Sequence, residues 1–396
     1  MISVDLALEK ILARVERLPS ETVPLGRSLG RVLARGATAH IDNPAFDVSA
    51  MDGYALRADD VNPGSTLDLI GVSQAGSAFH GTVGQGQCIR IFTGAPVPSG
   101  ADAVVMQEDV NANDDRITFN TDAQSGRNIR RRGEDFRAGR ELASQGTALT
   151  AHNIGLIAAG NNSTIEVSTL PSIGLLATGD ELVAPGTAIG ADQIVSSNTI
   201  ALSALLGPFA SIMTDHGIVA DDKDALERTL RSALDTEPDL LITTGGASVG
   251  EHDLVQDALR ACGVTMDFWR IAMRPGKPLM FGAHGKTLVF GLPGNPVSAL
   301  VTARIFILPA LKAMTGALSQ DPLLLPLAAP LPANGPRRHY LRARLERDAQ
   351  GRTTIDPIRQ TDSGHLSSLA SAEALIIQRE NCHGMSAGDY IEAILL

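Results

Sequence analysis

A glycine-rich loop between a buried strand and an amphipathic helix is the feature that most restricts the fold of this chain. The apolar run Asp239–Ile242 predicts a parallel strand, and Leu254–Arg260 has helical periodicity. The segment between them contains Gly245, Gly246 and Gly250. Open α/β sheets bind ligands at such loops, because backbone N–H groups and the helix N-terminus attract an anion there.

Two acidic residues in the same loop narrow the kind of anion site that is expected. Glu251 and Asp253 would repel a bare phosphate unless a divalent cation lay between them. The loop alone therefore fits two interpretations equally well. It is either a site for phosphate and Mg²⁺, or a turn in which Asp253 caps the following helix.

The loop lies within residues 171–315, where predicted strands alternate with predicted helices. This alternation predicts a doubly wound α/β sheet, and Asn198 is expected to cap one of its helices. The expected strands are Ile173–Ala177, Ser211–Thr214, Asp239–Ile242, Pro278–Phe281 and Leu288–Phe290. The expected helices are Thr199–Leu206, Lys223–Leu234, Leu254–Arg260 and Ala299–Met314.

The other segments predict three further parts. Residues 1–36 have helical spacing interrupted by prolines, and residues 148–168 combine a helix with a strand at Thr164–Val167. Residues 40–145 contain short apolar runs between turn residues, and residues 337–396 return to short strands after a proline-rich linker, Pro322–Pro336. The expected domains are a helical dimerisation domain (1–40 plus 146–170), an inserted β-rich domain (41–145), the α/β domain (171–320) and a C-terminal β domain (321–396).

Composition excludes several classes of partner. The net charge of −11 disfavours nonspecific nucleic-acid binding, and an aromatic content of 4% disfavours a base-stacking surface. No apolar run looks long enough to cross a bilayer, and the N-terminus has no signal-peptide pattern. The three cysteines are far apart, which disfavours a disulfide framework or a cysteine zinc site. A reducing cytoplasm is the expected location.

Further motifs are expected at the same sheet edge as the first loop. Gly291–Ala299 is a second strand-to-helix loop in which Asn295 suits the N-cap and Pro296 the first helical position. Asp180 and Glu181 follow the first strand, whereas the residues alone favour a helix cap for Asp221 and Asp222. The segment Arg270–Pro278 supplies three cations entering a predicted strand of the sheet.

Taken in order, the motifs of the chain resemble those of the molybdopterin molybdenumtransferases, the MoeA family, which is related to the C-terminal region of gephyrin. The resemblance covers essentially the whole chain. Its motifs are Met51-Asp52-Gly53-Tyr54, Thr93-Gly94-Ala95-Pro96, Arg132-Gly133-Glu134-Asp135, Thr178-Gly179-Asp180-Glu181-Leu182, Gly245-Gly246-Ala247-Ser248-Val249-Gly250, Pro275-Gly276-Lys277-Pro278 and Leu292-Pro293-Gly294-Asn295-Pro296.

The resemblance implies an elongated homodimer of four-domain subunits, with a MoaB/Mog-like α/β domain and a small C-terminal β-barrel. It implies that the substrates are adenylylated molybdopterin and molybdate, that the products are molybdenum cofactor and AMP, and that Mg²⁺ is the cofactor. The pterin nucleotide would lie at the α/β domain, in a cleft completed by the inserted domain of the partner subunit. A transient contact with the molybdopterin adenylyltransferase is also expected, whereas binding to nucleic acid or to a membrane is not.

The resemblance and the loops together define the candidate site residues. The expected catalytic residues are Asp52, Thr93, Asp135, Glu181 and Asp253, and the expected metal ligands are Glu181, Asp221 or Asp222, and Asp253. The two glycine loops would hold the diphosphate, and Arg270, Arg274 and Lys277 of the basic segment would hold molybdate. The expected substrate-binding residues are Gly245, Gly246, Ser248, Gly250, Arg270, Arg274, Lys277, Pro293, Gly294, Asn295, Ser298, Ser367 and Ser368.

Two departures from the family pattern are visible. Arg270 and Arg274 stand where relatives can carry lysine, which preserves the positive charge and changes its geometry. Glu373 stands where the family often has an asparagine, and a carboxylate cannot donate a hydrogen bond to an anion.

Two alternative functions remain at this stage. The α/β domain alone would also suit adenylyl transfer to molybdopterin, although the other parts of the chain exceed what that reaction needs. A binding scaffold like gephyrin is the second alternative, and the acidic residues at the sheet edge argue against it. Molybdate and tungstate are tetrahedral oxyanions of similar size, so the sequence does not separate them.

Overall fold

The computed structural model describes residues 1–246, 254–318, 321–360 and 362–396. They form two compact units. Unit 1 comprises Met1–Glu21 and Val167–Leu396, and unit 2 comprises Thr22–Glu166. The chain enters unit 2 within β1 (Ser20–Pro24) and leaves it within β12 (Thr164–Ser168). The expected division into four domains is finer than these two units and stays a prediction.

The central element of unit 1 is a six-stranded sheet whose order is β16-β13-β17-β21-β20-β18. The first four strands are parallel, and β20 is antiparallel to both of its neighbours. Their bounds are β13 (Ser172–Thr178), β16 (Ile212–Val219), β17 (Leu240–Thr244), β18 (Thr265–Phe268), β20 (Met280–His284) and β21 (Thr287–Leu292). A short parallel pair, β14 (Leu182–Val183) and β15 (Ile194–Val195), follows β13 in the chain.

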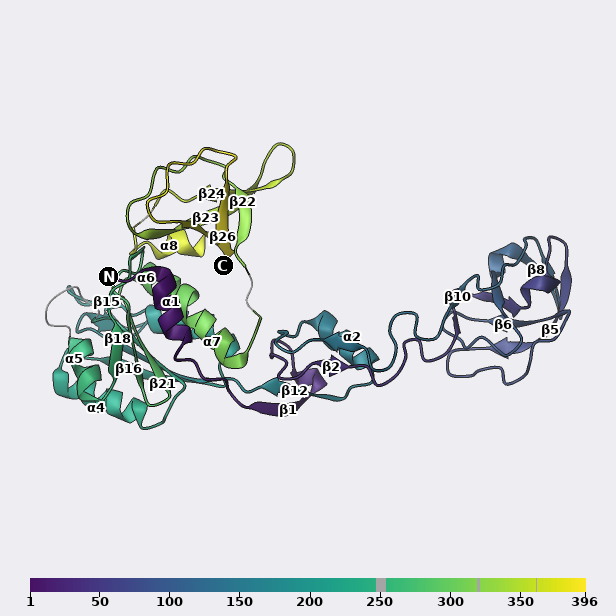
Figure 1. Cartoon of the computed structure of the whole chain (residues 1–396), viewed down its shortest axis with the longest axis horizontal. Coiled ribbons are helices and arrows are strands. Elements are labelled where there is room, and N and C mark those ends of the chain that lie inside the picture. The colour runs from purple at the N-terminus through teal and green to yellow at the C-terminus, as the bar shows by residue number, and fades with distance from the viewer. Residues whose placement is uncertain (247–253, 319–320, 361) are drawn as a thin grey trace. The chain divides into compact units, whose positions relative to one another are not determined.

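Helices cover both faces of this sheet, each over its own apolar core (Figure 1). One core contains buried side chains of α4 (Lys223–Leu234) and α5 (Leu254–Ala261). The other contains α1 (Val4–Leu12), α3 (Asn198–Leu206), and the continuous helix of α6 (Pro296–Thr302), a π-helical turn (Ala303–Ile307) and α7 (Leu308–Thr315). The expected doubly wound α/β architecture is confirmed.

The C-terminal part of unit 1 is a second sheet, ordered β19-β23-β25-β26-β22, with β24 paired to β23. Its strands are β19 (Met273–Arg274), β22 (Leu323–Pro326), β23 (Arg338–Arg347), β24 (Thr353–Pro357), β25 (Ala374–Gln378) and β26 (Tyr390–Leu395), and a short helix, α8 (Leu366–Ala370), precedes β25. Strand β19 belongs by sequence to the α/β region and pairs in parallel with β23. It therefore joins the two sheets of unit 1.

Unit 2 is built on a third six-stranded sheet, ordered β7-β4-β6-β5-β9-β8. These strands are β4 (Gly53–Leu56), β5 (Thr66–Ser73), β6 (Gln87–Ile91), β7 (Ala103–Met106), β8 (Val110–Asn113) and β9 (Arg116–Phe119). Smaller pairs join β2 (Ala37–Thr38) to β11 (Glu141–Ala143) and β3 (Val48–Ser49) to β10 (Ile129–Arg130). Helix α2 (Ala151–Ala159) starts with a capping box formed by Thr150 and Asn153.

The short 3₁₀ segments occur in both units. They are Leu25–Arg27, Ala58–Asp60 and Gln107–Asp109 in unit 2, and Gly207–Phe209 in unit 1.

Several local predictions were wrong. The expected helical character of residues 1–36 is limited to α1 and one 3₁₀ turn, and β1 lies where Pro19 and Pro24 interrupt the pattern. Ser197 rather than Asn198 is the N-cap residue of α3, because the Asn198 amide donates to the carbonyl of Gly294 instead. Part of the expected proline-rich linker forms the edge strand β22.

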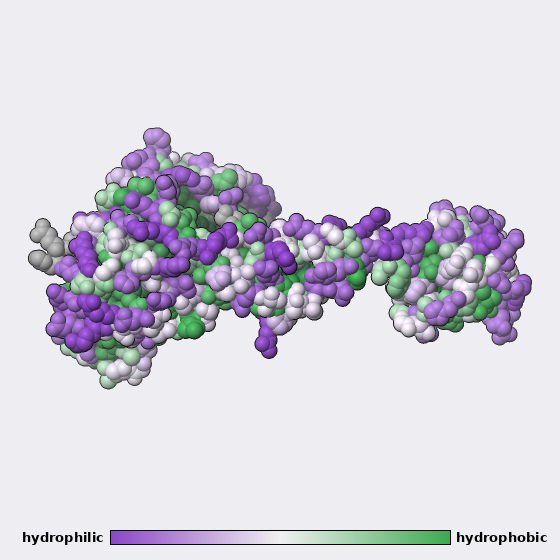
Figure 2. All heavy atoms as spheres, turned by 60° about the horizontal axis from the view of Figure 1, so that its bottom comes forward, coloured by the Kyte–Doolittle hydropathy of each residue, from purple (hydrophilic) through white to green (hydrophobic). Residues whose placement is uncertain are grey.

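One helix, Pro296–Thr315, is long and apolar enough to cross a membrane by length and composition, which the sequence did not lead us to expect. It is largely buried in the core of unit 1. Its apolar character is therefore explained by packing against the sheet. The face of the molecule in Figure 2 is mostly hydrophilic or intermediate, with small scattered hydrophobic areas.

A buried arginine connects α1 to the C-terminal sheet. The Arg338 guanidinium donates two hydrogen bonds of 2.7 Å to Asp5 and lies 3.2 Å from Glu380, while only 9% of its side chain is exposed. The hydrogen bond from Arg338 holds the pKa of Asp5 below its usual value. The stabilisation by this pair is therefore present above the ordinary carboxylate pKa and is lost as the pH falls through the lowered value.

We predict that Arg338→Ala lowers the free energy of unfolding of unit 1 by about 2 kcal/mol, since it removes the cation from a partly buried cluster. Urea unfolding followed by the fluorescence of Trp269, the only tryptophan of the chain, measures this change in the free energy of unfolding. Arg352→Ala is the control because the pair of Arg352 with Asp348 is exposed, and its effect should stay below about 0.5 kcal/mol. Equal effects of the two variants would contradict the structural role of Arg338.

Candidate functional site

The loops that follow β13, β17 and β21 meet at one edge of the α/β sheet. Thr244 at the end of β17 pairs in register with Ala177 of β13 and Leu292 of β21, so the three strands end at the same level. A Cβ atom on Gly245 would lie 2.0 Å from the carbonyl oxygen of Thr178, and Gly245 has a φ of +91°. Only glycine fits this position, because any side chain would collide with the neighbouring backbone.

A cavity of about 340 Å³ opens at this edge, and we call it the strand-end pocket. Glu181, Gly245, Pro293, Gly294 and Asn295, all expected from the sequence, line it. The other lining residues are Thr178, Leu182, Ile194, Val195, Ser196, Ser197, Asn198, Thr244, Pro278 and Pro296. The Asn198 amide supports the second glycine loop through its 2.8 Å hydrogen bond to Gly294.

A second cavity of about 400 Å³, here the basic pocket, lies between the α/β region and the C-terminal sheet. It shares Pro278 and Asn295 with the strand-end pocket. The Asn295 amide donates to the Ser363 hydroxyl at 2.9 Å, which joins the two regions at the boundary of the pockets. The remaining lining residues are Met273, Arg274, Pro275, Gly276, Lys277, Ser298, Arg337, His339, Asp362 and Ser363 itself.

The basic pocket carries an excess of positive charge. Arg274, Lys277 and Arg337 line it, whereas Asp362 is the one carboxylate among its described lining residues. Burial of His339, together with the nearby guanidinium groups, lowers the pKa of its ring to about 4. A pocket with three cations and polar amide and hydroxyl groups suits an oxyanion.

The acidic residues near the strand-end pocket have different roles. Asp221 accepts a 2.8 Å hydrogen bond from the Thr178 hydroxyl, and its N–H donates to Asp180. Asp222 instead accepts from the N–H of Ala225 at 2.8 Å and caps α4. Of this pair, the structure links Asp221 to a residue that lines the pocket. Among the described residues, no group of three or more His, Cys, Asp or Glu side chains is arranged to hold a metal ion.

In unit 2, Asp52 and Thr93 are brought together by the antiparallel pairing of β4 and β6. The Asp52 carboxylate accepts hydrogen bonds from the Thr93 N–H at 2.7 Å and from its hydroxyl at 2.8 Å. These bonds hold the pKa of Asp52 below its usual value. Arg90 stacks over the rings of Tyr54 and Phe92 and donates to the carbonyl of Gly53, the residue after Asp52.

Other expected site residues lie elsewhere. Asp135 accepts a hydrogen bond from the Asn43 amide at 3.0 Å, so its described side-chain partner lies outside the Asp52–Thr93 pair. Arg270 lies over the ring of Trp269 at 4.1 Å and lines neither of the two pockets. Gly246 adopts a φ of +63° beside Val255. Ser248, Gly250 and Asp253 lie outside the described residues.

The C-terminal serines differ from expectation. Ser367 is exposed, and Ser368 is buried against Arg342, to which its hydroxyl is bonded at 2.7 Å. Among the described serines of the C-terminal part, Ser363 lines the basic pocket. Glu373 accepts from the N–H of Leu345, which places its carboxylate within the C-terminal sheet.

Sequence reasoning missed two groups of lining residues. One surrounds the start of α3, where Ser196, Ser197 and Asn198 carry no glycine or charge signal. The other is Arg337, His339, Asp362 and Ser363 of the C-terminal part. The basic run Arg337-Arg338-His339 was a usable signal, but only the pairing of β19 with β23 brings it beside Arg274. The cations were also expected in the α/β sheet, whereas Arg274 lies in a strand of the C-terminal sheet.

Comparison with known families matches nearly the whole chain in three segments. Residues 2–160 match the MoeA N-terminal region (domain I and II), and residues 174–313 match a "probable molybdopterin binding domain". Residues 325–396 match the MoeA C-terminal region (domain IV).

Individual relatives agree with these matches. A molybdopterin molybdenumtransferase of Haemophilus influenzae is 38% identical over 80% of this chain and 78% of its own length. Molybdopterin molybdenumtransferase 2 of Mycobacterium tuberculosis is 35% identical over 94% of both chains. The crystal structure of the molybdopterin biosynthesis MoeA protein of Pyrococcus horikoshii superposes with a TM-score of 0.84 at 28% identity, over the full length of both chains.

We predict that Gly245→Ala lowers the free energy of unfolding by on the order of 2 kcal/mol, because the added Cβ meets a carbonyl oxygen in a left-handed backbone conformation. Gly294→Ala is the matched control. Its Cβ would meet only the Cα of Gly245, at 3.7 Å. Thermal unfolding followed by Trp269 fluorescence compares the two, and a fully stable Gly245→Ala variant would contradict the contact between the loops.

Proposed function

This chain belongs to the molybdopterin molybdenumtransferase (MoeA) family, and we propose that it inserts molybdate into adenylylated molybdopterin with release of AMP. The observation that carries the proposal is the pair of adjacent pockets that share Pro278 and Asn295. One suits a phosphate-bearing nucleotide and the other an oxyanion. Their common boundary suits a reaction in which the two substrates must meet.

The strand-end pocket supplies the features expected of a diphosphate site. Gly245 and Gly294 leave the loop backbones uncovered by side chains, so N–H groups can approach phosphate oxygens closely. The N-terminus of α6, which begins at Pro296 beside the pocket, adds a partial positive charge. Both features favour the anhydride of an adenylylated pterin.

Mg²⁺ is part of the proposal, with Glu181 and Asp221 as the residues that would hold it. The donor set fits, because Mg²⁺ usually takes one or two protein carboxylates and completes its shell with water and substrate phosphate. A preformed cluster of three carboxylates is therefore not required. When bound, the cation would neutralise charge on the phosphates. Asp222 is engaged as a helix cap, and Asp253 keeps its proposed ligand role from the sequence.

The basic pocket is proposed to hold molybdate. Arg274, Lys277 and Arg337 supply positive charge, and Ser298, Ser363 and Asn295 supply neutral hydrogen-bonding groups around it. In unit 2, two hydrogen bonds from Thr93 hold the pKa of the Asp52 carboxylate below its usual value, so this group is ionised at neutral pH. We propose that Asp52 accepts protons or orders water as oxo groups leave, and that Asp135 serves in the same step.

We also propose that the protein is a cytoplasmic homodimer that contacts the molybdopterin adenylyltransferase transiently. These features follow from the family resemblance. Sedimentation of the purified chain tests the dimer directly, since a subunit has a mass of 41.5 kDa. A monomer at micromolar concentration would overturn that part of the proposal.

We predict molybdate-dependent release of AMP when purified protein is incubated with adenylylated molybdopterin, Mg²⁺ and molybdate. AMP is quantified by chromatography, and the active cofactor by reconstitution of a molybdenum enzyme. Formation of adenylylated pterin from ATP and molybdopterin, without AMP release, would move the assignment to the adenylylation step. Tight pterin binding with neither activity would favour a scaffold role.

We predict that Glu181→Gln lowers the rate of AMP release by about 100-fold or more while unfolding is unchanged, because a carboxylate that holds the cation is lost. Asp222→Asn is the matched control, since an asparagine still caps α4 and its rate should stay within about threefold of wild type. Full activity of Glu181→Gln would remove Glu181 from the proposed site.

A further inference from the structure

The basic pocket contains one ring that the proposed roles leave unused. His339 of β23 lines the pocket, yet only 7% of the residue is exposed. Among the described residues, its Nδ1 atom has no hydrogen-bond partner. The residue pairs in register with Arg274 of β19 on one side and Gln378 of β25 on the other. His339 is therefore held in a fixed place beside the cations.

The charges around this ring are mostly positive. The charged side chains that face the ring or line the same pocket are Arg274 of β19, Lys277 before β20, Arg337 just before β23, Arg342 on β23, and Asp362 before α8. Burial is the largest influence and, with Arg274, Arg342 and Arg337, lowers the pKa of His339 to about 4. A side-chain hydrogen bond with Gln378 raises this pKa, but by a smaller amount. The empty pocket therefore contains a neutral histidine at neutral pH.

We propose that His339 is a positioning residue that takes up a proton when a tetrahedral dianion such as molybdate enters the basic pocket. The inference rests on the proposed function, because it assumes that this pocket receives the oxyanion. The proton comes from solvent and adds to the ring nitrogen that carries the lone pair. No other bond forms or breaks.

The same geometry that keeps the ring neutral makes it respond to an anion. Without a ligand, a proton on His339 would add a further positive charge beside the guanidinium groups of Arg274 and Arg337 in a place shielded from water. A dianion offsets these charges and favours the protonated ring. By linkage, the protonated ring must then favour the dianion by the same factor. The pocket thereby gains affinity for dianions, whereas a monoanion such as chloride offsets less charge.

Calorimetric titration of the full-length protein with molybdate at pH 6, 7 and 8 tests the coupling. In the wild type, the Kd for molybdate should fall by about tenfold for each unit by which the pH is lowered below the pKa of His339 in the molybdate complex. Titration in buffers of different ionisation enthalpy should show uptake of about one proton at pH 6. In His339→Gln, the Kd should equal the wild-type value at pH 8 within about threefold, because the amide keeps a neutral polar group, and should change little with pH.

A second variant keeps the ring in place. In Arg337→Gln, one of the charges that lower the pKa of His339 is lost, so the free ring should titrate at higher pH. Histidine-selective NMR measures this, with the His339 signal identified by its absence from the His339→Gln spectrum. In the wild type, that signal should show protonation between pH 6 and 8 only when molybdate is present.

The outcomes separate this inference from the proposed function. An identical pH dependence of molybdate binding in wild type and His339→Gln would overturn the role of His339 and leave the oxyanion pocket standing. Molybdate-dependent AMP release without any binding to this pocket, seen as unchanged affinity in Arg274→Gln, would also overturn it. Absence of both molybdate binding and AMP release would overturn the proposed function together with the inference.

Discussion

The common level at which three parallel strands end is the constraint on which the rest of the site depends. Strands β13, β17 and β21 are held in register through Ala177, Thr244 and Leu292. Their following loops consequently meet at one edge, so closely that the backbone at Gly245 has no room for a Cβ atom. The Glu181 carboxylate from one loop and the glycine backbone of the other two loops therefore share a single pocket.

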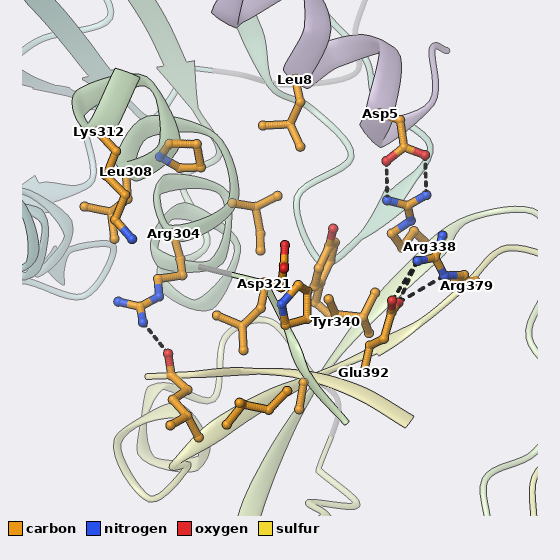
Figure 3. A pocket seen from close by; sticks show the side chains of 18 of the residues that line it. Asp5, Leu8, Arg304, Leu308, Lys312, Asp321, Arg338, Tyr340, Arg379 and Glu392 are labelled. Carbon is orange, nitrogen blue, oxygen red and sulfur yellow. Dashed lines mark hydrogen bonds and ion pairs between the residues drawn. The ribbon is translucent and has the colours of Figure 1, made fainter. Parts of the chain in front are cut away.

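The second sheet of unit 1 supplies what the first sheet lacks. The overall charge of the chain is negative, so an oxyanion site requires cations to be gathered locally. Strand β19 belongs by sequence to the α/β region but pairs with β23 of the second sheet. This pairing brings Arg274 beside His339 and close to Arg337. The hydrogen bonds from the buried Arg338 guanidinium to Asp5 then tie this sheet to α1 (Figure 3).

Sequence reasoning succeeded where local pattern and tertiary structure agree. The amphipathic period of residues 223–234 predicted α4 with its observed bounds, since one face of that helix packs on the sheet and the other is solvated. The glycine loops were recognised because a close backbone approach requires a residue without Cβ. Sequence reasoning failed where a polar side chain has two available hydrogen-bond partners. Asn198 was expected to cap a helix and instead bonds to Gly294. The hydroxyl of Ser368, which was expected to bind substrate, accepts a hydrogen bond from Arg342, and its substrate role stays a prediction.

The sequence by itself determined the order of the helices and of every strand of the α/β sheet except β18, the glycine positions at the sheet edge and the family of the chain. These features depend on residue type and local spacing. Only the tertiary structure decided which of Asp221 and Asp222 contacts a pocket residue, and that Arg337, His339 and Ser363 complete the basic pocket. Those outcomes depend on contacts between segments tens of residues apart, and such contacts are set by strand pairing and packing, which leave no periodic signal in the chain.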